Sequence, residues 1–441
     1  MSERKHLNAQ SLYDTLRGYC HRHPDLQGTQ ASRQGRTFTI TDTLMSGLAL
    51  FSLKFSSLLQ FDKSSNETII RHNLKNLFGV AVAPSDTYMR EILDRLDPQA
   101  LGGAFKELFH LVQRGKVLER FQFLDQYYLL SVDGTGYFSS REVHCDSCCK
   151  KNHRDGTVTY YHQILGAVLV HPDEPVVLPF APEPIFQQDG VRKNDCERNA
   201  AKRLLPRIRQ DHPHLPLIVV EDGLASNAPH IEVLKSQNMR FILGAKEKDH
   251  KWLFDWVRNS DEVEEVSYTK GKRRGILRFL NDAPLNDSRS DVRVNFLECV
   301  ETTEKGKEIR FTWVTDLKIT RKNAQQLMKG GRARWKKENE TFNTLKNHGY
   351  QFEHNFGHGK QNLSTIFVNL MLLAFYVDQI QQTASKAFKR AMSYVRGNKS
   401  TLWNKLKSAV MWLCLESWEQ AFGLIAQEIK TDATMMLVDS P

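Results

Sequence analysis

The sequence has no stretch that is typical of a secretory leader or a membrane span. Its first ten residues, MSERKHLNAQ, are polar, and no apolar run of leader length follows them. The most apolar segment, 363–377, is shorter than the roughly 20 residues that cross a bilayer, so we expect a buried core helix there. Seven cysteines, an odd number in a chain of 441 residues, argue against a disulfide framework. These absences predict a cytoplasmic protein that does not enter a membrane.

Acidic residues are fewer than basic ones, with 51 Asp and Glu against 61 Lys and Arg, and the formal charge is +10. A basic surplus of this size favours a polyanionic partner, most simply nucleic acid, although it could also serve solubility alone. Apolar residues make up 40% of the chain and charged residues 25%, which is typical of a globular protein with a core. The length predicts two or three domains.

The pattern along the chain predicts five regions. Residues 1–120 are mostly helical, and 121–249 have strand-like runs up to Asp133, in GTGYFSSREV and at 157–170, before helices and strands alternate. This β-β-β-α-β-α-β order matches the ribonuclease-H-like fold. Residues 250–320 alternate between apolar and polar and predict an all-β insertion, whereas 321–380 hold two helices and 381–441 a helical region with a tail. We therefore expect an α+β or α/β chain in which the insertion interrupts a ribonuclease-H-like catalytic domain.

Two aspartates follow apolar, strand-like runs in the predicted catalytic domain. Asp133 stands in LLSVDGTGYFSS and Asp222 ends LPLIVVED. In a ribonuclease-H-like sheet these strand ends are neighbours, and two carboxylates that close repel unless a cation lies between them. Oxygen ligands at strand ends suit Mg²⁺ and metal-assisted phosphoryl transfer. Either aspartate alone could instead be an ordinary turn residue.

A third acid is expected on a later helix, 332–346, and the candidates are Glu338, Glu340 and Glu353. On this helix the chain resembles the DDE transposases of bacterial insertion sequences that carry a β-strand insertion and a Y-x2-R-x3-E-x6-K motif. Arg334 and Glu338 keep the R-x3-E step inside RWKKEN, and SVDGT, VVEDGLASN and FTWVTDL extend the resemblance over roughly 80–375. Glu338 is therefore preferred.

The motif is incomplete on both sides of the acid. Its Tyr position falls on Gly331, and its Lys position falls on Leu345, so that Lys346 comes one residue late. One residue turns an α-helix by about 100°, so Lys346 would point elsewhere unless the helix carries a bulge. Trp335, beside the acid, is expected in the core.

The resemblance implies cleavage of transposon ends and strand transfer into target DNA. Two Mg²⁺ or Mn²⁺ ions would be held by Asp133, Asp222 and Glu338. The partners would be double-stranded terminal inverted repeats and target DNA, bound by a homodimer in the bacterial nucleoid, with end binding by the helical N- and C-terminal regions. An inactive, transposase-derived DNA-binding regulator and a structure-specific nuclease on the same fold are the alternatives.

Further candidates are a Cys/His loop and several basic residues. The loop HCDSCCKKNH could bind Zn²⁺ through Cys145, Cys148, Cys149 and His153, or it could be a hairpin loop with reduced thiols; His354 and His358 are not expected to be ligands. The hairpin tip KGKRRG and two later segments offer the expected DNA contacts. These are Arg334, Lys346, Lys360, Lys270, Lys272, Arg273 and Arg274.

Overall fold

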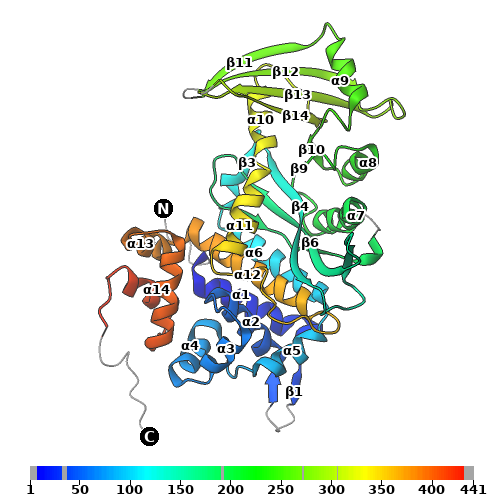
Figure 1. Cartoon of the computed structure of the whole chain (residues 1–441). Coiled ribbons are helices and arrows are strands. Elements are labelled where there is room, and N and C mark those ends of the chain that lie inside the picture. Colours follow the sequence, from blue (N-terminus) through cyan, green and yellow to red (C-terminus); the bar gives the residue numbers. More distant parts are fainter. Residues whose placement is uncertain (1–6, 32–36, 190–192, 271–272, 305, 432–441) are drawn as a thin grey trace.

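A computed structural model of the chain describes every residue except 1–6, 32–36, 190–192, 271–272, 305 and 432–441 (Figure 1). The protein is a mixed α/β structure built on one mixed sheet of twelve strands. The main path through this sheet runs β11-β12-β13-β14-β10-β9-β4-β6-β5, and the short strands β3, β7 and β8 pair with β4 or β6. One sheet therefore carries both the predicted catalytic domain and the predicted insertion.

The central part of the sheet combines parallel and antiparallel pairs. β9 is parallel to both β4 and β10, whereas β6 is antiparallel to β4 and to the short strands β7 and β8. The apolar run LIVVE of β9 is buried throughout, as expected for a strand covered on both faces. The bounds are β3 Gln122–Phe123, β4 Tyr127–Ser140, β5 Cys149–Asn152, β6 Val158–Val170, β7 Leu178–Pro179, β8 Glu183–Ile185, β9 Leu217–Glu221 and β10 Arg240–Gly244.

The first two predicted strands of this part are one strand. β4 continues through Asp133 to Ser140, and its pairing with β6 shifts register between Gly136 and Phe138. The prediction that a strand ends at Asp133 is therefore wrong. The irregular stretch lies at Gly136, within a long strand, because such a bulge bends a strand without ending it.

The region 250–320 extends the same sheet. Its last strand, β14, pairs antiparallel with β10, and β13, β12 and β11 follow in antiparallel order. The expectation that this region is all β is wrong at its start, where the helix α9 packs on β12. The charged and aromatic residues of α9 recur at the spacing of a helix, and its Leu253 and Phe254 are buried. The bounds are α9 Lys251–Arg258, β11 Glu264–Lys270, β12 Arg273–Pro284, β13 Arg293–Thr302 and β14 Glu308–Thr315.

Helices cover both faces of the sheet. α7 and α8 lie on one side of β4, β9 and β10, and α10 and α11 lie on the other (Figure 1). The helix predicted at 332–346 is divided by a turn at 333–334 and then by a π-helix, η6. The bounds are α7 Lys193–Asp211, α8 Ala228–Ser236, α10 Ala324–Arg332, η6 Lys337–Phe342 and α11 Asn343–Asn347.

The N-terminal helices surround one long apolar helix, α12. It packs against α2, α5, α6 and β7, so it joins the helical region to the sheet. By length and composition α12 could cross a membrane, but its apolar stretch is entirely buried inside the protein, as the predicted core helix should be. The bounds are α1 Ala9–Arg22, β1 Thr29–Ala31, β2 Thr37–Thr39, α2 Ile40–Ser52, α3 Leu58–Ser65, α4 Thr68–Phe78, α5 Asp86–Asp94, α6 Gly102–Arg114 and α12 Leu363–Ala384.

The C-terminal helices pack against the N-terminal ones. α14 contacts α4, and α15 contacts α1, so the two ends of the described chain meet (Figure 1). The buried Asn73 of α4 donates to the carbonyls of Val410 and Leu413 and accepts from the amide of Leu415. The bounds are α13 Lys386–Tyr394, α14 Lys399–Trp412 and α15 Trp418–Ile425.

Candidate functional site

Asp133 and Asp222 lie side by side on neighbouring parallel strands. The last pair between β4 and β9 is Ser131 with Val220, and each aspartate follows its member of that pair by two residues. Both side chains line one small pocket of about 40 Å³. The two acids are therefore neighbours, as predicted, although only β9 ends at this point and β4 continues past it.

Backbone amides orient both carboxylates. The amide of Gly134 donates to Oδ1 of Asp133 at 2.9 Å, and the amide of Leu224 donates to Oδ1 of Asp222 at 2.9 Å. In each case the second carboxylate oxygen stays available to another partner. Two acids held in this way offer hard oxygen donors at one place on the sheet.

Glu338 reaches Asp133 through an arginine. A terminal nitrogen of the Arg334 guanidinium lies 2.8 Å from Oε1 of Glu338 and 3.6 Å from Oδ2 of Asp133. The three predicted acids do not gather their oxygens around one point, because the only group of three or more metal-binding side chains within the described residues is a Cys/His cluster. Arg334 thus links Asp133 and Glu338 without a metal ion.

The helix that carries Glu338 has an extra residue in its turn. Residues Lys337–Phe342 form the π-helix η6, whose wider turn is the kind of bulge that would bring Lys346 closer to the expected motif position. The side chain of Lys346 nevertheless pairs with Glu353, at 2.6 Å. The structure therefore supplies the bulge but places Lys346 beside another glutamate.

Sequence reasoning missed Lys337, the residue before the acid. Its side chain is buried, and its ammonium donates to the carbonyls of Asp133 and Gly166 at 2.7 and 2.6 Å. Burial lowers the pKa of Lys337 to about 7, although the nearby Asp133 and Glu221 carboxylates act in the opposite direction. A lysine within a basic run, RWKKEN, gives no local signal that its ammonium turns inward.

A fourth acid, Glu197 of α7, lies against Gly134 and lines the same pocket as Asp133. A Cβ atom added to Gly134 would stand only 2.5 Å from Oε1 of Glu197, and both Glu197 and Glu221 line the pocket of Asp133 and Asp222. Gly134 is therefore needed for the approach of a side chain of the protein itself. No motif in the sequence pointed to Glu197, because α7 comes close to Asp133 and Asp222 only when the chain is folded.

Two of the four predicted zinc ligands, Cys145 and Cys148, lie in a Cys/His cluster, and the other two do not. Cys145, Cys148, His162 and His358 gather their donor atoms within 4.8 Å of one another. Cys149 is not among them, because its Sγ turns to the carbonyl of Ile185. His153 is also excluded and pairs with Thr159 across the hairpin. The missing two ligands come from β6 and from the segment between α11 and α12, and His358 was expected not to be a ligand.

The predicted DNA-contacting residues are scattered. Lys360 and Arg274 are exposed. Lys272 lies outside the described residues, and so do the side chains of Lys270 and Arg273, although these two residues pair where β11 meets β12. Trp335, expected in the core, is 53% exposed and lies beside the Arg334 guanidinium.

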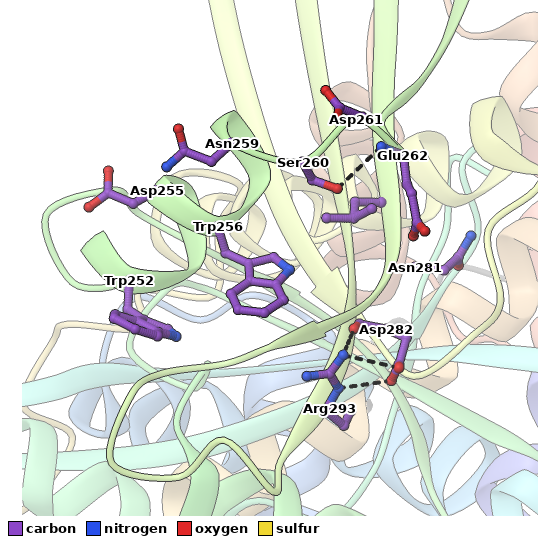
Figure 2. A pocket seen from close by; sticks show the side chains of 11 residues that line it. Trp252, Asp255, Trp256, Asn259, Ser260, Asp261, Glu262, Asn281, Asp282 and Arg293 are labelled. Carbon is purple, nitrogen blue, oxygen red and sulfur yellow. Dashed lines mark hydrogen bonds and ion pairs between the residues drawn. The ribbon is translucent and has the colours of Figure 1, made fainter.

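A larger hollow than the pocket of Asp133 and Asp222 lies elsewhere. A cavity of about 630 Å³ opens between α9 and the strands β12 and β13, lined by Trp252 and Trp256 (Figure 2). Figure 2 shows Arg293 bonded to Asp282 at its edge. None of the acids near Asp133 lines this cavity. Its own acids, among them Asp261 and Glu262, were not among the candidates that the sequence selected.

In comparisons with known protein families and with curated proteins, no family and no curated protein matches this sequence. Two donor sets stand out. One is a group of carboxylates on the sheet with an arginine and a buried lysine, and the other is a buried set of sulfur and nitrogen atoms. The first suits hard cations and the second suits Zn²⁺.

Proposed function

We propose that the protein is a DDE-type transposase that cleaves transposon ends and joins them to target DNA in a Mg²⁺-dependent reaction. The observation that carries this proposal is the register of β4 and β9, which sets Asp133 beside Asp222. Arg334 adds Glu338 to the same neighbourhood. These are the three acids that the resemblance to transposases selects.

The order of the central strands supports a ribonuclease-H-like catalytic domain. β7 and β8 lie at one side of β6, followed by β4, β9 and β10, with the first pairs antiparallel and the last two parallel. Helices α7 and α8 connect and cover the parallel strands, as a βαβ arrangement requires. The acids then lie at the carboxyl end of β9 and beside it on β4, where ligands of open α/β sheets bind.

The carboxylates of Asp133, Asp222 and Glu338 would hold the metal ions. Bound Mg²⁺ or Mn²⁺ would supply activation of the attacking oxygen and stabilisation of the leaving oxygen. The donor set fits these ions, because all three side chains offer oxygen. Arg334 pairs with Asp133 and Glu338, and its guanidinium offers the planar donor groups that suit a phosphate.

The proposed partner is double-stranded DNA. The net charge of +10 favours a polyanionic partner. Two of the basic residues expected to contact DNA are exposed: Lys360, between α11 and α12, and Arg274, on β12 of the insertion. Trp335 offers an exposed ring next to the acids, which can pack against a distorted base step. A homodimer on DNA, in the bacterial nucleoid, completes the proposal.

The decisive experiment measures cleavage and strand transfer with labelled terminal inverted repeats taken from the DNA that flanks the gene. We expect D133N, D222N and E338Q each to reduce Mg²⁺-dependent cleavage by at least a thousandfold while DNA binding persists. E340Q and E353Q are matched controls, since they remove the same charge from the same region and should retain cleavage.

The products separate the alternatives. Cleavage without joining would make the protein a structure-specific nuclease, and specific binding without any cleavage would make it a DNA-binding regulator. Full activity in D133N or D222N would contradict the assignment of the site itself.

A further inference from the structure

We propose that Cys145, Cys148, His162 and His358 form a structural Zn²⁺ site that ties the edge of the sheet to the segment between α11 and α12. This site is separate from the carboxylates and does not depend on the proposed function. Three parts of the chain meet in it. The two cysteines come from the β4–β5 connection, His162 from β6, and His358 from the segment that leads into α12.

The distances between the donor atoms are those of a tetrahedron around zinc. Zn–S bonds of about 2.3 Å and Zn–N bonds of about 2.0 Å give edges of about 3.8 Å between sulfurs, 3.5 Å between sulfur and nitrogen and 3.3 Å between nitrogens. The two Sγ atoms are 3.8 Å apart, and the two Nε2 atoms are 3.0 Å apart. Three of the four Sγ–Nε2 distances are 3.5, 3.3 and 3.4 Å, and the fourth, from Cys145 to His358, is within 4.8 Å.

The surroundings of the four side chains support a metal. Cys148, His162 and His358 are buried, and Cys145 is half-buried, so an ion held there would be closed off from solvent. Nδ1 of His358 lies 2.9 Å from the carbonyl of Gly359, which leaves Nε2 free to bind, as is usual for metal-ligating histidines. The amide of Cys145 donates to Sγ of Cys148 at 3.4 Å.

The donor set selects zinc and a structural role. Two thiolates and two imidazoles suit Zn²⁺ rather than Mg²⁺, and four protein ligands leave no open position for a substrate. Binding releases two thiol protons to solvent, and the two thiolates balance the charge of the ion.

The site would fix the chain that follows the predicted third acid. His358 comes after α11, and four consecutive amides that begin two residues later, those of residues 360–363, donate to the Asp94 carboxylate of α5. The segment is thus held to the sheet by the metal and to the N-terminal helices by Asp94. Loss of zinc would release one of these two attachments.

The test is the zinc content of the tag-free, full-length protein after growth with added zinc. We expect about one zinc per chain, and a fall to near zero in C145S and H358Q. The matched controls are C149S and H354Q, which remove a neighbouring thiol and a neighbouring imidazole outside the cluster and should keep the metal. Chelation should lower the melting temperature of the wild type, and zinc should restore it.

Cobalt gives a measurement on the wild-type chain that does not require any variant to fold. Replacement of zinc by Co²⁺ should produce the visible bands of a tetrahedral ion together with sulfur-to-cobalt charge transfer. Well under one zinc per chain, an octahedral cobalt spectrum, or a Cys145–Cys148 disulfide in protein purified from reducing cells would overturn the proposal. Retention of zinc by H358Q would do so as well.

Discussion

At the scale of single residues, the close approach of Glu197 to Gly134 allows a test of how the acids around Asp133 are packed. A Cβ at position 134 would stand 2.5 Å from Oε1 of Glu197. We expect G134A to cost about 1 kcal/mol of unfolding free energy, because the glutamate must move from a packed position. Cleavage should fall with it, because Glu197 would be pushed within the pocket of Asp133 and Asp222.

The double variant G134A/E197A removes the clash and should recover the lost stability, as measured by urea unfolding. G102A is the control, because nothing lies within 4 Å of its added Cβ and its backbone is already helical. Equal stability of G134A and wild type would show that Glu197 moves away at no cost.

Residue identity predicted some of the site and misled in other parts. The apolar runs before Asp133 and Asp222 predicted strands, and the β-β-β-α-β-α-β order of elements was then enough to expect neighbouring carboxylates. The cysteine spacing found Cys145 and Cys148, but Cys149 was misassigned because successive side chains of an extended chain point to opposite sides. His162 and His358 are 196 positions apart, so no local pattern connects them.

At the scale of elements, Asp94 joins α5 to the start of α12. Its two carboxylate oxygens accept from the amides of residues 360–363, at 2.9 to 3.0 Å, and so serve the amides that have no partner within a helix. These backbone hydrogen bonds lower the pKa of Asp94 against the opposing effect of burial. A distant element thus provides the cap that the sequence next to α12 lacks.

We expect D94N to lower the free energy of unfolding by about 1–2 kcal/mol at neutral pH. Because the pKa is lower in the folded state, the ionised carboxylate stabilises the fold above the unfolded value of about 3.9, and this contribution is lost as the pH falls through the folded value. The difference between D94N and wild type should therefore shrink below about pH 4.

Urea unfolding at several pH values measures this difference. D14N is the control, because Asp14 is exposed on α1 and its carboxylate bonds to Gln10 one turn away. A D94N deficit that stays constant down to low pH would show that the charge of Asp94 has no part in the cap.

The elements themselves were predictable to different degrees. The type of most elements follows from periodicity, but the division of 332–346 by a turn and a π-helix does not, because it depends on the inward turn of Lys337 toward β4 and β6. The continuity of β4 past Asp133 was also hidden, since a Gly-Thr-Gly sequence in a strand resembles a turn.

At the scale of the whole molecule, a buried ion pair holds the helical region together. The Lys54 ammonium lies 2.6 Å from Oδ2 of Asp378 and 3.8 Å from the centre of the Tyr350 ring, and the Tyr350 hydroxyl donates to the same carboxylate. Burial lowers the pKa of Lys54 and raises that of Asp378. The N-terminal helices, the segment after α11, and α12 therefore meet at one pair of charges.

We expect D378A to cost about 3–5 kcal/mol, because it leaves the Lys54 ammonium buried without its counter-charge. The double variant K54M/D378L replaces both charges by apolar groups and should recover much of this loss. Chemical unfolding of the full chain measures both. E419A, which breaks the exposed pair between Arg390 and Glu419, should change stability by less than about 1 kcal/mol. A D378A loss as small as that of E419A would contradict the role of the pair.

The continuous sheet also sets a fixed length between two parts of the molecule. Across the sheet, β12 beside the basic hairpin is followed by β13, β14, β10 and then β9, which ends just before Asp222. Each strand in this series is hydrogen-bonded to the next. Four strand spacings of about 4.8 Å put these two strands about 19 Å apart across the sheet. The hydrogen-bonded ladder is continuous along this path, so the sheet itself fixes the sideways spacing of β12 and β9. A ligand that lay across these two strands would have to adapt to that spacing, because the paired strands cannot change it.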